Sequence, residues 1–115
     1  MQPKKLKKYG SKGPEAKIQR KIINRLRREE WFVLETHGNM YQYGFPDLFA
    51  THTRYGHRWI EVKLPDMVGS KFTPAQIETF PKLVAFGSGV WILTGDSDLE
   101  FCKLHKPCNW MFYLH

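Results

Sequence analysis

The chain has 115 residues, which is enough for one domain with a modest core and too few for two domains of ordinary size. It carries 18 Lys and Arg against 11 Asp and Glu, and this net charge of +7 favours a polyanionic partner such as nucleic acid. No apolar run approaches the roughly 20 residues that span a bilayer, and no apolar segment follows the lysine-rich start as in a secretory signal. We therefore expect a soluble, intracellular protein.

Residues 1–13 are predicted to form a basic, flexible tail, and residues 14–115 a single domain. Lysines are concentrated in the tail, and further basic residues follow on or near the first predicted helix. Such a tail is typical of chains that contact a phosphate backbone, although a solubilising terminus or, less directly, a localisation signal would have the same composition. The tail lysines are Lys4, Lys5, Lys7, Lys8 and Lys12.

The domain is predicted to begin with a helix over residues 14–30. Ile18, Ile22 and Leu26 recur at every fourth position, so they form one apolar stripe along a helix. Pro14 suits the first helical position, where the donor that proline lacks has no partner within the helix. The apolar stripe predicts that this helix packs on the rest of the domain.

Three segments rich in β-forming residues follow the helix, at residues 32–36, 47–51 and 58–64. The last of them alternates between apolar and charged residues, which is typical of a strand. Tyr55 and Gly56 lie in the short connection between the second and third segments and favour a turn. The second and third segments are therefore predicted to form a hairpin.

A second helix is predicted over residues 74–86, followed by a short buried strand at residues 90–94. Pro81 lies inside this helix and is expected to kink or divide it, because proline lacks a donor and crowds the preceding turn. The resulting order of helix, three strands, helix and strand is an α/β layout. Further along, residues 102–104 and 110–114 are apolar enough to pack, or alternatively to form a partner surface.

Two carboxylates and a lysine are expected to meet at the end of the hairpin. Side chains alternate along a strand, so Glu61 and Lys63 share one face while Ile60 and Val62 point into the core. Antiparallel pairing brings Asp47 towards Glu61. Neighbouring carboxylates repel each other unless a proton or a cation lies between them, and a hard divalent ion such as Mg²⁺ prefers oxygen ligands. The pattern therefore predicts a metal site with an adjacent lysine.

These residues match a known signature. Pro46-Asp47 followed by Glu61-Val62-Lys63 resembles the motif of the PD-(D/E)xK nucleases, and the flanking blocks resemble their VRR-NUC branch. The resemblance spans residues 15–76 and implies a stand-alone VRR-NUC-like domain with a restriction-endonuclease-like core and a central mixed sheet. The blocks that carry it are Glu15 with Gln19, Gly44-Phe45-Pro46-Asp47-Leu48, Trp59-Ile60-Glu61-Val62-Lys63-Leu64-Pro65 and Gln76.

The resemblance also implies a role for each residue. Asp47 and Glu61 would bind Mg²⁺ or Mn²⁺, with the backbone carbonyl of Val62 as a further ligand. Glu15 would reach the same metal from the first helix. Lys63 would position or activate the attacking water and stabilise negative charge on the phosphate. These residue types suit phosphodiester hydrolysis, which needs a nucleophilic water and neutralisation of charge at phosphorus.

Gln76 is implied to orient the site from the second helix, although it also has a simpler explanation. Residues 73–76 form a good capping box, in which Gln76 closes back on the start of the helix. Glu15 likewise suits the first turn of a helix, where a carboxylate interacts with the positive end of the dipole. Glu61 and Lys63, taken alone, fit an ordinary solvated pair on a strand. Position in the fold decides between these explanations.

Other candidate ligands are expected to serve packing. Cys102 and Cys108, with His105 between them, lack a Cys-x-x-Cys pair, so we expect two free thiols rather than a zinc site. His52 and His57 flank the predicted turn. They are interpreted as surface or packing residues, with substrate contact as an alternative.

Aromatic residues precede the first carboxylate. Tyr41, Tyr43 and Phe45 suit either the core or base stacking, and we expect most of them to lie in the core. On the other side of the predicted site, residues 66–71 are expected to form a mobile loop. Lys71 of this loop is a candidate phosphate contact.

The implied activity is that of a metal-dependent, structure-selective DNA endonuclease. A stand-alone domain of this kind is expected to act as a homodimer with two active sites, and four-way junctions share its two-fold symmetry. Holliday-junction resolution is therefore the leading expectation, followed by flap or nicking cleavage. A catalytically silent nucleic-acid-binding module, a structural component of a phage or repair assembly and an RNA-cutting nuclease are alternatives. The expected location is the cytoplasm of a bacterial or phage-infected cell.

Overall fold

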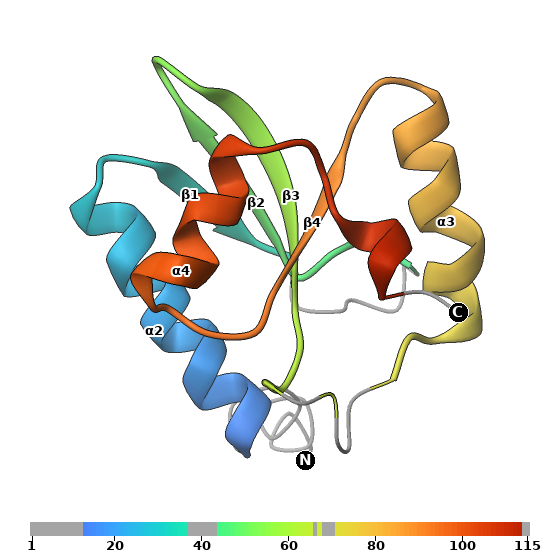
Figure 1. Cartoon of the computed structure of the whole chain (residues 1–115), viewed down its shortest axis with the longest axis horizontal. Coiled ribbons are helices and arrows are strands. Elements are labelled where there is room, and N and C mark those ends of the chain that lie inside the picture. The colour runs from blue at the N-terminus through green and yellow to red at the C-terminus, as the bar shows by residue number, and fades with distance from the viewer. Residues whose placement is uncertain (1–12, 37–43, 66, 68–70, 114–115) are drawn as a thin grey trace, which may run out of the picture.

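The computed structural model describes residues 13–36, 44–65, 67 and 71–113. The basic tail, Tyr41, Tyr43 and most of the loop at 66–71 therefore lie outside the described residues. The element order confirms the predicted α/β layout of helix, three strands, helix and strand (Figure 1). The elements are α2 (Pro14–Arg28), β1 (Phe32–Glu35), β2 (Leu48–His52), β3 (Gly56–Val62), α3 (Pro74–Ala85), β4 (Val90–Leu93), α4 (Asp98–Phe101) and the 3-10 turns η1 (Cys102–His105) and η2 (Trp110–Phe112).

The strands form one mixed sheet in the order β1-β2-β3-β4. The first two neighbouring pairs are antiparallel, whereas β3 and β4 are parallel. Leu48 lies opposite Ile60 and His52 opposite Gly56, which confirms the predicted hairpin. The chain then crosses through α3 to reach β4, because parallel neighbours cannot be joined by a tight turn. The sheet thus joins a meander to one β-α-β unit.

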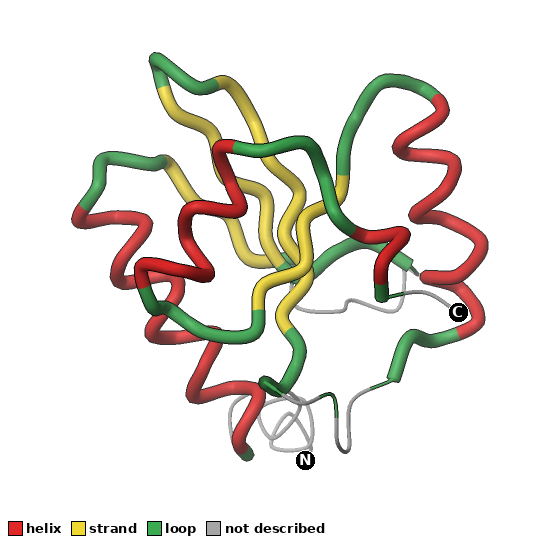
Figure 2. Tube along the Cα trace, in the orientation of Figure 1, coloured by secondary structure: helices red, strands yellow, loops and turns green. Residues whose placement is uncertain are grey.

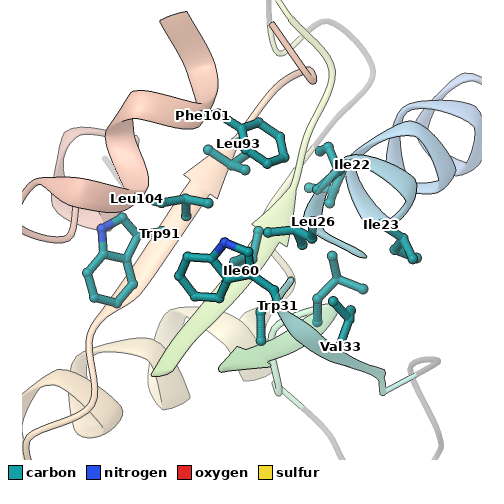
Figure 3. Close-up of a cluster of buried hydrophobic side chains, with 13 residues drawn as sticks. Ile22, Ile23, Leu26, Trp31, Val33, Ile60, Trp91, Leu93, Phe101 and Leu104 are labelled. Atoms are coloured by element: carbon teal, nitrogen blue, oxygen red, sulfur yellow. The ribbon is translucent and has the colours of Figure 1, made fainter. Parts of the chain in front are cut away.

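The larger core lies between the sheet and α2, with α4 and η1 completing the cover (Figure 3). Ile22, Ile23 and Leu26 of α2 are fully buried there, as the predicted apolar stripe requires. Burial of side chains of this size contributes about 1.5–3 kcal/mol each, so this face supplies much of the stability. The strand residues in this core are Val33, Leu48, Ala50, Ile60, Val62, Trp91 and Leu93, joined by Trp31, Phe101 and Leu104.

A smaller core lies on the opposite face of the sheet, where α3 packs beside β4 (Figure 2). Phe80 of α3 is fully buried against Val90 and Ile92 of β4. Since successive side chains of β4 alternate between the two cores, this strand is covered on both faces. The prediction of a short buried strand is therefore confirmed.

Helix α3 begins at a complete capping box. The Thr73 side chain accepts from the amide of Gln76 at 3.1 Å, and the Gln76 side chain accepts from the amide of Thr73 at 3.0 Å. The helix then runs through Pro81 as one element, so the predicted helix is confirmed and the proline does not divide it; a kink at this position stays a prediction. Proline removes a single hydrogen bond of the ladder, and the burial of Phe80 on β4 holds the helix together across that position.

The segment after β4 folds back on both cores. Arg25 of α2 forms a hydrogen bond to the carbonyl of Asp96 at 2.7 Å and an ion pair with Asp98 at 2.8 Å. Phe101 and Leu104 are buried in the larger core, and Trp110 packs against the smaller one. Some apolar residues after 96 thus act in packing, whereas Leu99, Met111 and Phe112 are exposed, so a partner surface stays a prediction for this segment. None of the helices in the described ranges has the length and apolar character needed to cross a bilayer.

Gly44 fixes the segment that leads into β2. Its φ of +77° is in the left-handed region, and a Cβ at this position would lie 2.5 Å from the carbonyl oxygen of Ala75 and against the hydroxyl of Thr79. Both neighbours belong to α3. The backbone before β2 can therefore touch α3 only because residue 44 has no side chain.

We predict that Gly44→Ala lowers the free energy of unfolding by about 2–5 kcal/mol, because it adds a clash with a helix backbone to the cost of a positive φ. Gly56→Ala is the matched control, since Gly56 has a φ of +83° but nothing within 4 Å of the added Cβ. It is expected to cost only about 1–2 kcal/mol. Urea unfolding of both variants measures the difference, and equal losses would contradict the close approach to α3.

Candidate active site

The hairpin brings Asp47 and Glu61 together at one end of the sheet. Asp47 immediately precedes β2, and Leu48 pairs with Ile60, so Asp47 comes opposite Glu61 on the face that also carries α3. The Asp47 amide donates to Glu61 Oε1 at 3.1 Å, and the Val62 amide donates to Asp47 Oδ2 at 2.8 Å. Each of the two acids thus accepts a hydrogen bond from a backbone amide of the other segment.

Lys63 is held inside the site. Its side chain is 5% exposed and that of Glu61 is 3% exposed, which rules out an ordinary solvated pair. The ammonium lies 3.2 Å from Glu61 Oε2, donates to the carbonyl of Lys71 at 2.5 Å and lies 4.6 Å from the ring centroid of Phe72. The Lys63 amide also donates to the carbonyl of Leu93 at 3.0 Å. The lysine therefore presents its charge from a fixed backbone.

Gln76 performs both of the functions considered for it. Its amide nitrogen donates to Glu61 Oε2 at 3.0 Å while its oxygen closes the capping box at Thr73. Because the two atoms of one amide have different partners, the start of α3 fixes the orientation of Glu61. Every hydrogen bond of the cap therefore also positions an acid of the site.

Glu15 approaches the site from the first turn of α2. This end of α2 lies at the end of the sheet where β3 finishes (Figure 1). The negative charge of Glu15 is one of the influences that raise the pKa of Asp47, so the two carboxylates are close enough to repel each other. The structure thus brings together Asp47, Glu61, Lys63 and Gln76, with Glu15 near enough to influence Asp47 electrostatically.

Burial and mutual repulsion change the acidity of the two central carboxylates. Burial, followed by the charge of Asp47, raises the pKa of Glu61 to about 8, although Lys63 and Gln76 oppose this change. Burial also raises the pKa of Asp47 to about 6, against the opposing hydrogen bond from Val62. Both changes reflect the cost of charging two facing acids away from water. Strong perturbation of this kind is typical of functional sites.

The donor set fits a hard divalent cation. Two facing carboxylates that bind protons tightly can exchange a proton for Mg²⁺ or Mn²⁺, which take oxygen ligands and keep several waters. Across the described residues there is no preformed group of three or more His, Cys, Asp and Glu side chains that could hold a metal. Mg²⁺ is usually bound by few protein ligands and several waters. A role for the Val62 carbonyl as a ligand stays a prediction.

Phe72 and the Lys71 carbonyl are the contacts of Lys63 that sequence reasoning missed. Lys71 was considered only as a phosphate contact through its side chain, whereas its carbonyl accepts from Lys63. Phe72 packs edge-on against Phe80, with ring centroids 6.0 Å apart, and so joins the site to the smaller core. The available signal was an apolar residue just before a strong N-cap, the position of a hydrophobic staple.

The remaining candidates are packing residues. His52 lies 5.1 Å from the Trp31 ring and 4.6 Å from the Tyr55 ring, and its Nδ1 accepts from the amide of Arg54. His57 stacks on Phe49 with ring centroids 5.9 Å apart. Substrate contact by either histidine stays untested. The two cysteines, Cys102 and Cys108, are free thiols as predicted.

Comparison with known proteins gives one informative match. No family model and no curated protein matches the sequence. A solved VRR_NUC domain superposes with a TM-score of 0.60 at 21% sequence identity, over 79% of this chain and 95% of that one. At this identity the likeness is one of fold. The chain therefore has the VRR_NUC fold, a restriction-endonuclease-like arrangement, and the predicted fold class is confirmed.

The raised pKa values of Asp47 and Glu61 predict how stability changes with pH. A group with a raised folded-state pKa stabilises the protein below its unfolded pKa, and this contribution is lost as pH rises through the folded value. Without divalent metal, the chain should therefore lose at least about 2 kcal/mol of unfolding free energy between pH 4.5 and 8. Glu61→Gln, which mimics the protonated acid, should remove most of this loss.

Thermal unfolding in EDTA across this pH range is the measurement. Glu78→Gln is the matched control, because Glu78 is an exposed carboxylate of α3 paired with Lys82. Its profile should follow that of the wild type. Mg²⁺ added at pH 8 should raise the stability of the wild type and leave that of Glu61→Gln unchanged. A wild-type stability that is flat with pH would show that the two acids are not in the environment described.

Proposed function

We propose that this chain is a metal-dependent DNA endonuclease that hydrolyses phosphodiester bonds. The observation that carries the proposal is the buried group of Asp47, Glu61 and Lys63, in which two acids of raised proton affinity face each other beside a fixed ammonium. The VRR_NUC fold and the net charge of +7 support it further. An intact acid, acid and lysine set argues against a silent binding module, which has no need of it.

Each residue has a distinct part in this proposal. Asp47 and Glu61 would hold Mg²⁺ or Mn²⁺, assisted by Glu15 and the Val62 carbonyl. The bound ion would supply a water of lowered pKa and charge neutralisation at the phosphate. Lys63 would donate to a phosphate oxygen or to the attacking water, since its ammonium is already directed at Glu61 Oε2.

Gln76 has a supporting part, because it fixes Glu61 without taking a proton from it. A carboxylate that is held by an amide on one oxygen and by the Asp47 backbone on the other has little freedom to rotate. Because Glu61 is already oriented, it does not have to reorient during the chemical step. The capping box of α3 is therefore part of the proposed catalytic arrangement.

For the substrate, we propose a branched DNA, in first place a four-way junction cut by a homodimer. A single domain of this size presents one active site, and two opposed cuts need two sites related by symmetry. Flap and nicking cleavage are the same chemistry on other substrates, and the assay below separates them. The net positive charge favours any of these polyanions over an uncharged substrate.

Lys63→Met is predicted to lower the cleavage rate at least about 100-fold, because it keeps the length of the buried side chain and removes its charge. The assay compares a labelled four-way junction with linear duplex, flap and single strand, in Mg²⁺, Mn²⁺ or EDTA. Lys82→Met is the matched control, since Lys82 is an exposed lysine on α3.

Paired nicks on the junction that need metal and Lys63, from a protein that sediments as a dimer, are the expected result. Metal-dependent cutting of other substrates alone would keep the nuclease and remove the resolvase assignment. Equal rates for Lys63→Met and Lys82→Met, with both variants folded by circular dichroism, would overturn the proposed site.

A further inference from the structure

Among the described residues, the face of the sheet that carries the acids is only half covered. Helix α3 packs on β4, at the opposite edge from β1 (Figures 1 and 2). On the β1 side of the same face, Phe32 is 60% exposed and Leu34 is 51% exposed. Phe49 of β2 and Trp59 of β3 continue this face and are only partly buried. An apolar, mainly aromatic surface therefore lies open beside the site.

This surface is continuous with the two carboxylates. Phe49 is two residues from Asp47, and Trp59 is two residues from Glu61, so each ring shares a face with its acid at about 7 Å along the strand. The Phe49 and Trp59 rings touch, with centroids 5.0 Å apart. If the phosphate of a ligand bound at the acids, the neighbouring part of the ligand would thus contact the Phe49 and Trp59 rings.

Phe45 extends this aromatic surface and is held rigidly. It lies between Gly44, which is docked on α3, and Pro46, which is fully buried. Thr36 Oγ1 fixes the same turn by donating to the carbonyl of Pro46 at 2.8 Å. Phe45 itself is 39% exposed, and its ring meets that of Trp59 at 5.7 Å. It is therefore an open aromatic side chain on a fixed backbone.

We propose that Phe45, Phe49 and Trp59 form a stacking subsite for an unpaired nucleobase next to the phosphate that is cut. This inference rests on the proposed nuclease function and defines its substrate class as strands with unpaired nucleotides at the cleavage point. Bases in an intact duplex stack on each other and offer no free face, whereas an unpaired base can stack on an aromatic ring.

Charge and composition favour this occupant over a second copy of the chain. The net charge of +7 complements a polynucleotide, and the neighbouring acids would hold its phosphate through a cation. The Trp59 ring touches those of Phe45 and Phe49, and the acids proposed to bind phosphate through a metal lie beside them. This arrangement matches the alternation of base and phosphate along a nucleic-acid strand.

The test moves an abasic nucleotide one position at a time along a single strand and along one arm of a junction. In the wild type, one position beside the cut should raise KM by at least about fivefold, as expected for loss of one stacked base. Phe45→Ala should no longer distinguish the abasic from the normal strand, and Phe45→Tyr should restore the discrimination. Phe86→Ala is the matched control, because Phe86 is 89% exposed at the end of α3 and should behave as the wild type.

A binding assay separates this inference from the nuclease proposal. Strands with 2-aminopurine at each position are titrated with protein in EDTA, and stacking should quench one position in the wild type and in Phe86→Ala but not in Phe45→Ala. Quenching without cleavage in any metal would retain the subsite and remove the nuclease. Cleavage that ignores the abasic substitution, or a Phe45→Ala variant that changes only the sedimenting mass, would overturn the subsite and assign the surface to contacts between copies.

Discussion

The structure depends on one electrostatic constraint, namely the half-buried Asp47 and the buried Glu61, which face each other across a hairpin. Glu61 Oε1 accepts from the Asp47 amide and Asp47 Oδ2 accepts from the Val62 amide, so the two acids are held together at the end of the β2–β3 ladder. Burial and proximity make their joint ionisation costly, and Lys63 offsets only part of that cost. A protein core alone gains nothing from such a pair, because apolar residues of similar size would pack there without penalty. The arrangement is explained if a cation binds between the two acids.

The rest of the fold delivers further groups to this pair. The parallel contact with β4 fixes the backbone of Lys63, and the capping box of α3 brings Gln76 onto Glu61. The N-terminal turn of α2 places a third carboxylate, Glu15, within electrostatic reach. Since α2 belongs to the larger core and α3 to the smaller one, both hydrophobic layers are needed to assemble the site.

Much of this could be predicted from the sequence, because the elements near the site have strong local signals. Period two along residues 58–64 was sufficient to place Glu61 and Lys63 together, and the hairpin register followed from a short turn. The approach of Glu15 to Asp47 could be stated only through the resemblance, since no local pattern determines where a helix end meets a sheet. Exposure of Phe45 was also not predicted, because it depends on how α3 and Gly44 meet. The continuous helix through Pro81 shows tertiary packing overriding a local preference.

Calorimetric titration of Mn²⁺ at pH 7, in two buffers of different protonation enthalpy, tests the exchange of proton for cation most directly. The account predicts that the wild type binds the ion and releases protons, because the pKa of Glu61 lies near 8 in its absence. Asp47→Asn should weaken binding at least about tenfold, which corresponds to about 1.4 kcal/mol. Binding that is unchanged in Asp47→Asn and releases no protons, or no binding by the wild type, would contradict the claim that the buried acids form a cation site.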